Sequence, residues 1–208
     1  MNQHTQITHI KDWLGHGSLN LFGMPFAGKD TQGEKLARHL GAPLVGGGDI
    51  LRGSIIPQHV KKIMHDGGLV PIEDYLQIVL PYLGRPEYHK RPLVLSSVGR
   101  WHGEETSVIE ALQQSEHHLK AVVFLTLDER IIWQRWKASQ RGSFRGQRHD
   151  DDADALEVRL EEFRLKTKPV IDFYRDLGVL IEIDGSQTIH AVEADIIASL
   201  TSLAAIKQ

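Results

Sequence analysis

A short glycine-containing stretch, GMPFAGKDTQ beginning at Gly23, carries the residue types that bind phosphate. Gly23 and Gly28 let the backbone turn tightly and direct its N–H groups at an anion. Lys29 follows as a mobile positive charge that suits terminal phosphates. The spacing matches G-x-x-x-x-G-K, although Asp30 stands where serine or threonine is usual and Thr31 comes one place later. The stretch predicts a nucleotide phosphate site, and the alternative is a glycine-rich turn that caps an ordinary helix.

The elements that would position this stretch are predicted on both sides of it. Residues 19–22 form an apolar run of strand length, and residues 29–40 show helical periodicity. Further strands are expected at 42–45, 92–97, 121–127 and 179–183. Further helices are expected at 50–67, 72–83, 104–115, 128–140, 153–177 (with a kink at Pro169) and 189–206, and a polar loop at 141–152. This alternation predicts an α/β fold in which helices cover both faces of a parallel sheet.

Notable residues follow three of the expected strands at the point where each strand ends. The glycine loop follows the first, Gly48-Asp49 the second and Gly99-Arg100 the third. Ligands of parallel sheets bind at the carboxyl ends of the strands, so the sequence predicts that these segments form one site.

Composition indicates one domain over residues 18–208, preceded by a polar arm over residues 1–17. The chain of 208 residues is 41% hydrophobic, which is enough for a full core. Ile10, Trp13 and Leu14 have helical spacing, so the arm either docks on the domain or is a partly ordered tail.

The charge and the apolar content limit the possible partners. A net charge of −3 gives no basis for binding a nucleic acid polymer, and a small polyanion is the better candidate ligand. No apolar run approaches about 18 residues, so no membrane span is expected. The N-terminus lacks the apolar segment of a secretory signal. With no cysteine, the composition fits a reducing compartment, and we expect a cytoplasmic protein.

The chain resembles adenylate kinases and, more broadly, nucleoside monophosphate kinases from about residue 19 to 200. The resemblance rests on several motifs that follow one another in the family's order. The family loop G-x-P-G-x-G-K-G-T-Q corresponds to GMPFAGKDTQ, and S-T-G-D-M-L-R corresponds to GGGDILR at Gly46. I-M-x-x-G-x-L-V corresponds to IMHDGGLV at Ile63, and D-G-F-P-R to SSVGR at Ser96. R-x-D-D corresponds to RHDD at Arg148, with a further arginine, Arg159, on the next helix.

The resemblance implies reversible phosphoryl transfer from ATP to a nucleoside monophosphate, with Mg²⁺ and with AMP as the first candidate acceptor. It implies a P-loop core with a five-stranded parallel sheet, a lobe of about 49–78 that closes over the monophosphate, and a short lid of about 141–148 over ATP. A monomer is the family expectation. Alternatives are a kinase for another monophosphate such as CMP or UMP, a nucleotide-binding protein with weak catalysis, and another small-molecule kinase with the same loop.

The resemblance also implies the residues of the two substrate sites. The ATP-binding residues would be Gly23, Pro25, Phe26, Ala27, Gly28, Lys29, Asp30, Thr31, Arg135 and Gln187. The monophosphate-binding residues would be Gly47, Gly48, Arg52, Gly68, Leu69, Val70, Gly99, Arg100, Glu104, Arg148 and Arg159. The catalytic residues would be Lys29, Arg100, Arg135, Arg148 and Arg159. Arginine suits this role because its charged fork matches phosphate oxygens, although each arginine is alternatively a surface ion pair.

Two departures from the family pattern concern the metal. Ser96 stands where the family has the aspartate that helps to hold magnesium, and Asp30 stands where the loop has glycine. Our hypothesis is that Asp30 supplies the carboxylate lost at Ser96, with Asp49 as a second magnesium-facing anion. Magnesium commonly uses one or two carboxylates together with phosphates and water.

Three other departures concern the loop and the acceptor base. Phe26 replaces a loop glycine, and Gly47 replaces a threonine that lies near the acceptor base. Glu104 replaces the glutamine that reads adenine. An ionised glutamate only accepts hydrogen bonds, so Glu104 either favours a base edge rich in donors or takes no part in reading the base.

Overall fold

The computed structural model describes residues 1–141 and 152–206. Its strands are β1 (Ser18–Gly23), β2 (Leu44–Gly46), β3 (Leu93–Ser96), β4 (Leu119–Thr126) and β5 (Leu180–Asp184). Its α-helices are α1 (Gln3–Leu14), α2 (Lys29–Leu40), α3 (Gly47–Gly53), α4 (Gln58–His65), α5 (Ile72–Leu83), α6 (Glu104–Gln114), α7 (Glu129–Arg141), α8 (Ala153–Glu162), α9 (Lys168–Asp176) and α10 (Ile189–Ile206). A 3₁₀ turn spans Pro86–Tyr88, and a π-helical turn spans Phe163–Thr167.

The strands form one parallel sheet in the order β2-β3-β1-β4-β5, which confirms the predicted five-stranded core. The register brings the ends of neighbouring strands together. Ser96, the last residue of β3, pairs with Gly46 on one side and with Leu21 on the other. The segments that follow β1, β2 and β3 therefore leave the sheet at the same edge.

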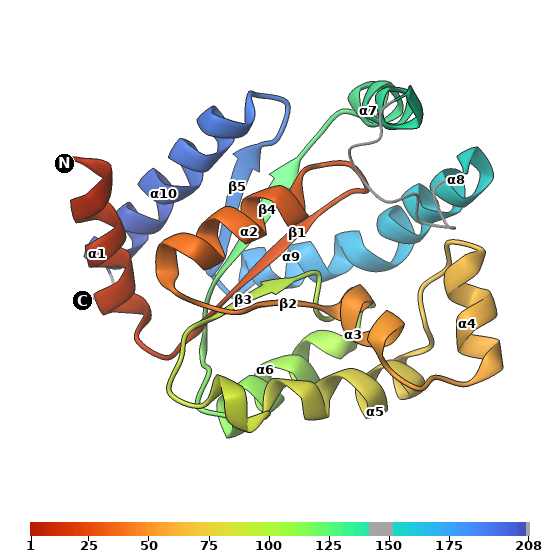
Figure 1. The fold of residues 1–208 in the computed structure, drawn as a ribbon, viewed down its shortest axis with the longest axis horizontal. Coiled ribbons are helices and arrows are strands. Elements are labelled where there is room, and N and C mark those ends of the chain that lie inside the picture. Colours follow the sequence, from red (N-terminus) through yellow and green to blue (C-terminus); the bar gives the residue numbers. More distant parts are fainter. Residues whose placement is uncertain (142–151, 207–208) are drawn as a thin grey trace.

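Alternate residues of the strands supply two apolar layers, as expected for a sheet buried on both faces. Leu19 and Leu21 belong to a cluster with the apolar residues of α1, α2 and α10. Phe22 faces the other way and contacts Tyr174 of α9, with 5.9 Å between the ring centroids. Figure 1 shows α1, α2 and α10 gathered on one side of the sheet, with α5 and α6 on the other.

The N-terminal arm forms α1, which packs beside α10 (Figure 1). Asn2 caps the helix by accepting the backbone N–H of Thr5 at 2.9 Å. Ile10, Trp13 and Leu14 are buried in the core cluster. Of the two alternatives for residues 1–17, the structure supports docking.

One long helix of the sequence prediction is wrong as a single helix, and another is helical over residues 153–176 but contains a π-helical turn. The helix expected at 50–67 is divided into α3 and α4, because Pro57 begins the second helix at its N-cap and the chain is extended just before it. The helix expected at 153–177 is interrupted by the π-helical turn Phe163–Thr167, and Pro169 lies in the first turn of α9, where its missing N–H is tolerated.

The helix α10 is the one helix of the described residues that is long and apolar enough, by length and composition, to cross a membrane. No such stretch was expected from the sequence. Core helices pass the same test, and the buried residues of α10 pack in the core cluster with α1, α2 and β5. This feature is weak support for a membrane span.

Candidate active site

The loop between β1 and α2 has the backbone of a phosphate-binding turn. Gly28 is left-handed, with a φ of 96°, and directly precedes α2. The first backbone N–H groups of α2 and the positive end of its dipole therefore face the loop. The side chain of Lys29 folds back over the loop, and its Nζ donates to the carbonyl of Met24 at 3.0 Å. Phe26, at the place of the family glycine, keeps a left-handed φ of 60°, which costs a side-chain-bearing residue about 1–2 kcal/mol.

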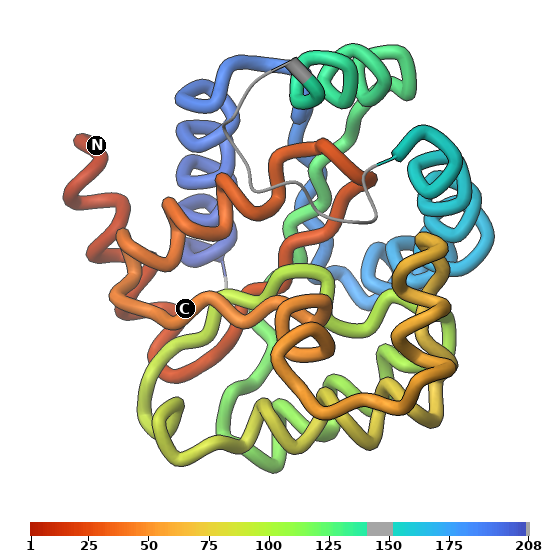
Figure 2. The backbone as a smooth tube through the Cα atoms, turned by 45° about the vertical axis from the view of Figure 1, so that its right-hand side comes forward, coloured from red at the N-terminus to blue at the C-terminus, as the bar shows by residue number. Residues whose placement is uncertain are grey.

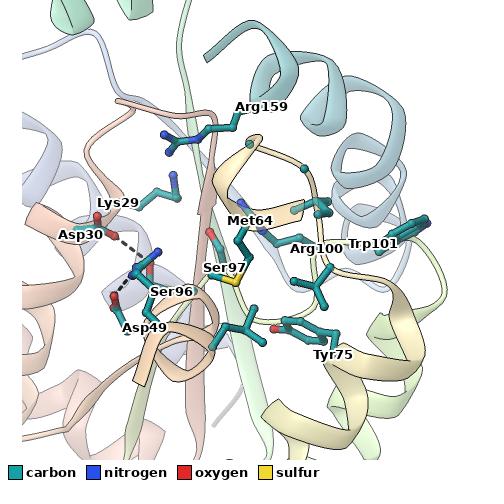
Figure 3. A pocket seen from close by; sticks show the side chains of 18 of the residues that line it. Lys29, Asp30, Asp49, Met64, Tyr75, Ser96, Ser97, Arg100, Trp101 and Arg159 are labelled. Atoms are coloured by element: carbon teal, nitrogen blue, oxygen red, sulfur yellow. Dashed lines mark hydrogen bonds and ion pairs between the residues drawn. The ribbon is translucent and has the colours of Figure 1, made fainter. Parts of the chain in front are cut away.

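The two residues of the metal hypothesis lie together at the base of this loop. The hydroxyl of Ser96, at the end of β3, donates to Oδ1 of Asp30 at 3.3 Å (Figure 3). Asp49 lies on the same side of the pocket, below Ser96 (Figure 3), and its carboxylate accepts a 2.5 Å bond from Arg52. Its side chain is 69% exposed, so Asp49 forms a solvated ion pair in this structure.

Three arginines face the loop from separate elements. Arg52 lies on α3, Arg100 follows β3 and Arg159 lies on α8. Burial lowers the pKa of Arg100, and the positive charges of Arg159 and Arg52 lower it further. Figure 3 shows Arg159 and Lys29 on the same side of the pocket, above Arg100. Cations that are gathered and partly desolvated in this way are stabilised by a bound polyanion.

The floor of the pocket is formed by Tyr75 and Glu104. The hydroxyl of Tyr75, a residue 6% exposed, accepts the backbone N–H of Gly99 at 2.9 Å. A Cβ at Gly47 would lie 2.7 Å from this hydroxyl, so the threonine of the family pattern does not fit beside Tyr75. Glu104 is 2% exposed and accepts the N–H of Trp101 at 3.0 Å. Burial raises the pKa of Glu104 to about 7.

The segment between α4 and α5 closes one side of the pocket by docking on α8. The backbone N–H of Leu69 donates to Glu162 at 3.1 Å, and Lys166 donates to the same carboxylate at 2.6 Å. Gly67 is left-handed, and a Cβ there would lie 2.6 Å from the carbonyl oxygen of Ala155. Both Figure 1 and Figure 2 show α4 beside α8. This docking holds the predicted monophosphate lobe against α8, the helix that carries Arg159.

A second pocket lies on the other side of the loop, between α2, α7 and the start of α10. Arg135 contributes to it, and its guanidinium donates to the carbonyls of Phe26 at 3.1 Å and Gly185 at 2.7 Å. Gln187 also lines this pocket and donates to Asp195 at 2.7 Å. Arg135 is thereby anchored to the rim of the loop, in a different pocket from Arg100 and Arg159.

The structure brings most of the predicted residues together. Those that line the first pocket are Phe26, Gly28, Lys29, Asp30, Gly48, Asp49, Arg52, Gly68, Leu69, Val70, Arg100, Glu104 and Arg159. Those that line the second are Phe26, Ala27, Gly28, Thr31, Arg135 and Gln187. Those that line neither pocket and shape the adjoining backbone are Gly23, Pro25, Gly47 and Gly99. Arg148 and the predicted lid, apart from the last backbone residue of α7, lie outside the described residues.

Sequence reasoning did not select several residues that line the first pocket, among them Met64, Tyr75, Ser97 and Trp101. Ser97 belongs to the SSVGR motif and has a left-handed φ of 52° at the family glycine, so its position was within reach of the motif comparison. Met64 belongs to the IMHDGGLV motif, and Trp101 directly follows Arg100. Tyr75 carries no signal of its own, because only tertiary packing brings α5 to this edge of the sheet.

A phosphate loop between the first strand and helix of a parallel sheet, faced by several arginines, defines a P-loop α/β protein that acts on phosphorylated ligands. Comparisons with known proteins agree. Residues 21–179 match the adenylate kinase family. Adenylate kinase of Methylobacterium radiotolerans is 33% identical over 188 residues, which cover 86% of this chain and 94% of that protein. Adenylate kinase of Hyphomonas neptunium is 33% identical over 192 residues, which cover 88% and 97%.

The chain belongs to the adenylate kinase family and is a phosphotransferase that acts between nucleotides. Among solved structures, a gluconokinase from Sinorhizobium meliloti 1021 is similar, with a TM-score of 0.63 and 20% identity. The similarity covers 91% of this chain and 94% of that one. At this identity it supports the P-loop kinase fold alone.

Proposed function

We propose that the protein catalyses reversible transfer of the γ-phosphoryl group of ATP to a nucleoside monophosphate, with AMP as the first candidate. The observation that carries the proposal is the meeting of Arg100 and Arg159 with Lys29 across one pocket. A protein that binds only ATP has little use for partly buried arginines on the far side of the phosphate loop.

The proposed division of roles follows from the two pockets. The loop holds the donor phosphates, and the pocket beside Arg135 takes the donor nucleoside. Arg52 and Arg100 hold the acceptor phosphate, while Lys29 and Arg159 stabilise charge on the group in transfer. Phosphoryl transfer depends mainly on alignment and charge stabilisation, so the mechanism does not depend on a strongly basic side chain.

Mg²⁺ is the proposed cofactor, and when bound it would neutralise charge on the phosphate oxygens. Asp30, beside Ser96, offers one carboxylate at the foot of the loop and fits this role. Within residues 1–141 and 152–206, no group of three or more His, Cys, Asp or Glu side chains could hold a metal. The ion would therefore share its ligands among Asp30, the nucleotide phosphates and water. Asp49 would join only after leaving its ion pair with Arg52.

The identity of the acceptor base is the finer part of the proposal. The overall motif pattern favours AMP, whereas the Gly47–Tyr75 arrangement departs from the family pattern and keeps a kinase for another monophosphate, such as CMP or UMP, as the alternative. Both alternatives use the same phosphate-binding residues. The remaining expectations, which are a monomer, a cytoplasmic location and no nucleic acid or membrane partner, stay predictions.

The proposal is tested by incubating the protein with ATP, Mg²⁺ and AMP, CMP, UMP or GMP separately, and by following diphosphate formation chromatographically. We expect one monophosphate to be converted much faster than the others. Lys29→Ala should abolish that activity, whereas Lys137→Ala, an exposed change on α7, should preserve it. Binding of ATP without conversion of any monophosphate would support a binding protein instead.

A further inference from the structure

The turn that carries Arg100 is held by side chains from two helices. Tyr75 of α5 accepts the backbone N–H of Gly99 at 2.9 Å. Glu104 of α6 accepts the backbone N–H of Trp101 at 3.0 Å, and the N–H of Arg100 itself is directed at the same carboxylate. Three consecutive backbone N–H groups around Arg100 are thus engaged by two side chains.

Both side chains are buried, so these bonds are made away from water. Glu104 is 2% exposed and Tyr75 is 6% exposed. Gly99 is left-handed, and a Cβ there would lie 2.9 Å from Val108, so the turn fits tightly against α6. A turn that is held in this way fixes the direction in which the guanidinium of Arg100 leaves the backbone.

We infer that Glu104 and Tyr75 are positioning residues for Arg100, and that Glu104 acts through the turn rather than by reading the acceptor base. This inference rests on the proposed function, in which Arg100 holds the acceptor phosphate. It also accounts for glutamate at position 104. A carboxylate has two acceptor oxygens for the two N–H groups, whereas a glutamine amide has one oxygen and would direct an NH₂ group at the second N–H.

The groups that face the Glu104 carboxylate come from every surrounding element. Arg100 lies on the turn itself, Glu105 follows on α6, Tyr75 lies on α5 and Tyr174 on α9. Arg100 is the cationic group among them. A glutamate that faces its own arginine and the turn backbone is already engaged before a substrate binds.

The test compares the wild type with Glu104→Gln and Tyr75→Phe. Calorimetry measures the affinity for the preferred monophosphate, for its nucleoside without phosphate, and for ATP. Losing one bond to the turn should weaken monophosphate binding roughly tenfold, because the phosphate contact of Arg100 is charge-assisted. Affinity for the nucleoside and for ATP should change less than twofold. Glu110→Gln, an exposed change on the same helix, and Tyr82→Phe, on the same helix as Tyr75, are the matched controls.

The outcomes separate the roles. If Glu104 reads the base, Glu104→Gln changes nucleoside affinity as much as monophosphate affinity, and the inference is wrong. If Glu104 and Tyr75 only support the fold, both variants lose stability without changing any of the three affinities, which also overturns it. Monophosphate binding that depends on these residues, in a protein that makes no diphosphate, would reject the proposed reaction and retain the positioning role. Absence of monophosphate binding in the wild type would reject both.

Discussion

Replacing Glu104 with glutamine should change how stability depends on pH. Burial raises the pKa of Glu104 in the folded protein from 4.5 to about 7. Between these values the folded state binds more protons at this site than the unfolded state does, so stability falls as pH rises through this window. Removing the ionisable group should remove that loss.

The size of the effect follows from the two pKa values. One pKa unit corresponds to about 1.4 kcal/mol, and linkage between pH 5 and pH 8 gives a loss of about 2.5 kcal/mol from Glu104 alone. Glutamine also leaves one N–H of the Arg100 turn without a good acceptor, which costs about 1–3 kcal/mol at every pH. Glu104→Gln should therefore be less stable than the wild type at pH 5. The difference in free energy of unfolding between the two proteins should then shift in favour of the variant as pH rises.

Urea unfolding at half-unit steps from pH 5 to pH 8 measures this difference. The other ionisable groups are present in both proteins, so their contributions cancel when the two curves are subtracted. Glu157→Gln, an exposed change on α8, controls for the loss of one negative charge. A wild-type minus variant difference that stays constant across the range would refute the account of Glu104 as a desolvated carboxylate.

Three further predictions concern the loop, the floor and the lobe. Asp30→Gly should weaken binding of magnesium-ATP by several-fold in calorimetry, and unchanged or tighter binding would reject the compensation hypothesis. Gly47→Thr should destabilise the protein by about 1–3 kcal/mol in urea unfolding, because Tyr75 fills the space that the threonine needs. Adding Tyr75→Val should recover part of that loss of stability, and additive effects of the two substitutions would contradict the contact. Glu162→Ala should speed amide hydrogen exchange at Leu69, and unchanged protection would mean that this bond does not hold the lobe.

Local patterns explain what was predictable in the fold. The strand–loop–helix around Lys29 was predicted because glycine spacing and apolar periodicity are features of neighbouring residues. The same alternation predicted a parallel sheet but not the order of its strands, which the structure gives as β2-β3-β1-β4-β5. The structure also places Ser96 beside Asp30. The π-helical turn at 163–167 was not predicted, because the segment FRLKT holds no glycine or proline that would mark a break in the helix.

The hydrogen bonds of Glu104 to the turn that carries Arg100 could not be predicted from the sequence, for a different reason. Motif comparison placed it at a base-reading position and left its role open. Its partners are backbone N–H groups of a turn, whose direction depends on a left-handed glycine and on a tyrosine from another helix. Such contacts have no residue pattern, so only the assembled structure reveals them. Arg135 is a similar case, because its bonds to two loop carbonyls separate it from Arg159.

Transfer of labelled phosphoryl from ATP tests the central claim most directly. ATP labelled at the γ-phosphate is mixed with Mg²⁺, the wild type and the preferred monophosphate, and the products are separated by chromatography. If Lys29, Arg100 and Arg159 align the two substrates in a dry pocket, the label appears in the β-phosphate of the new diphosphate, with little inorganic phosphate. Label that is released only as inorganic phosphate, or that remains entirely in ATP while both nucleotides bind, would contradict the account.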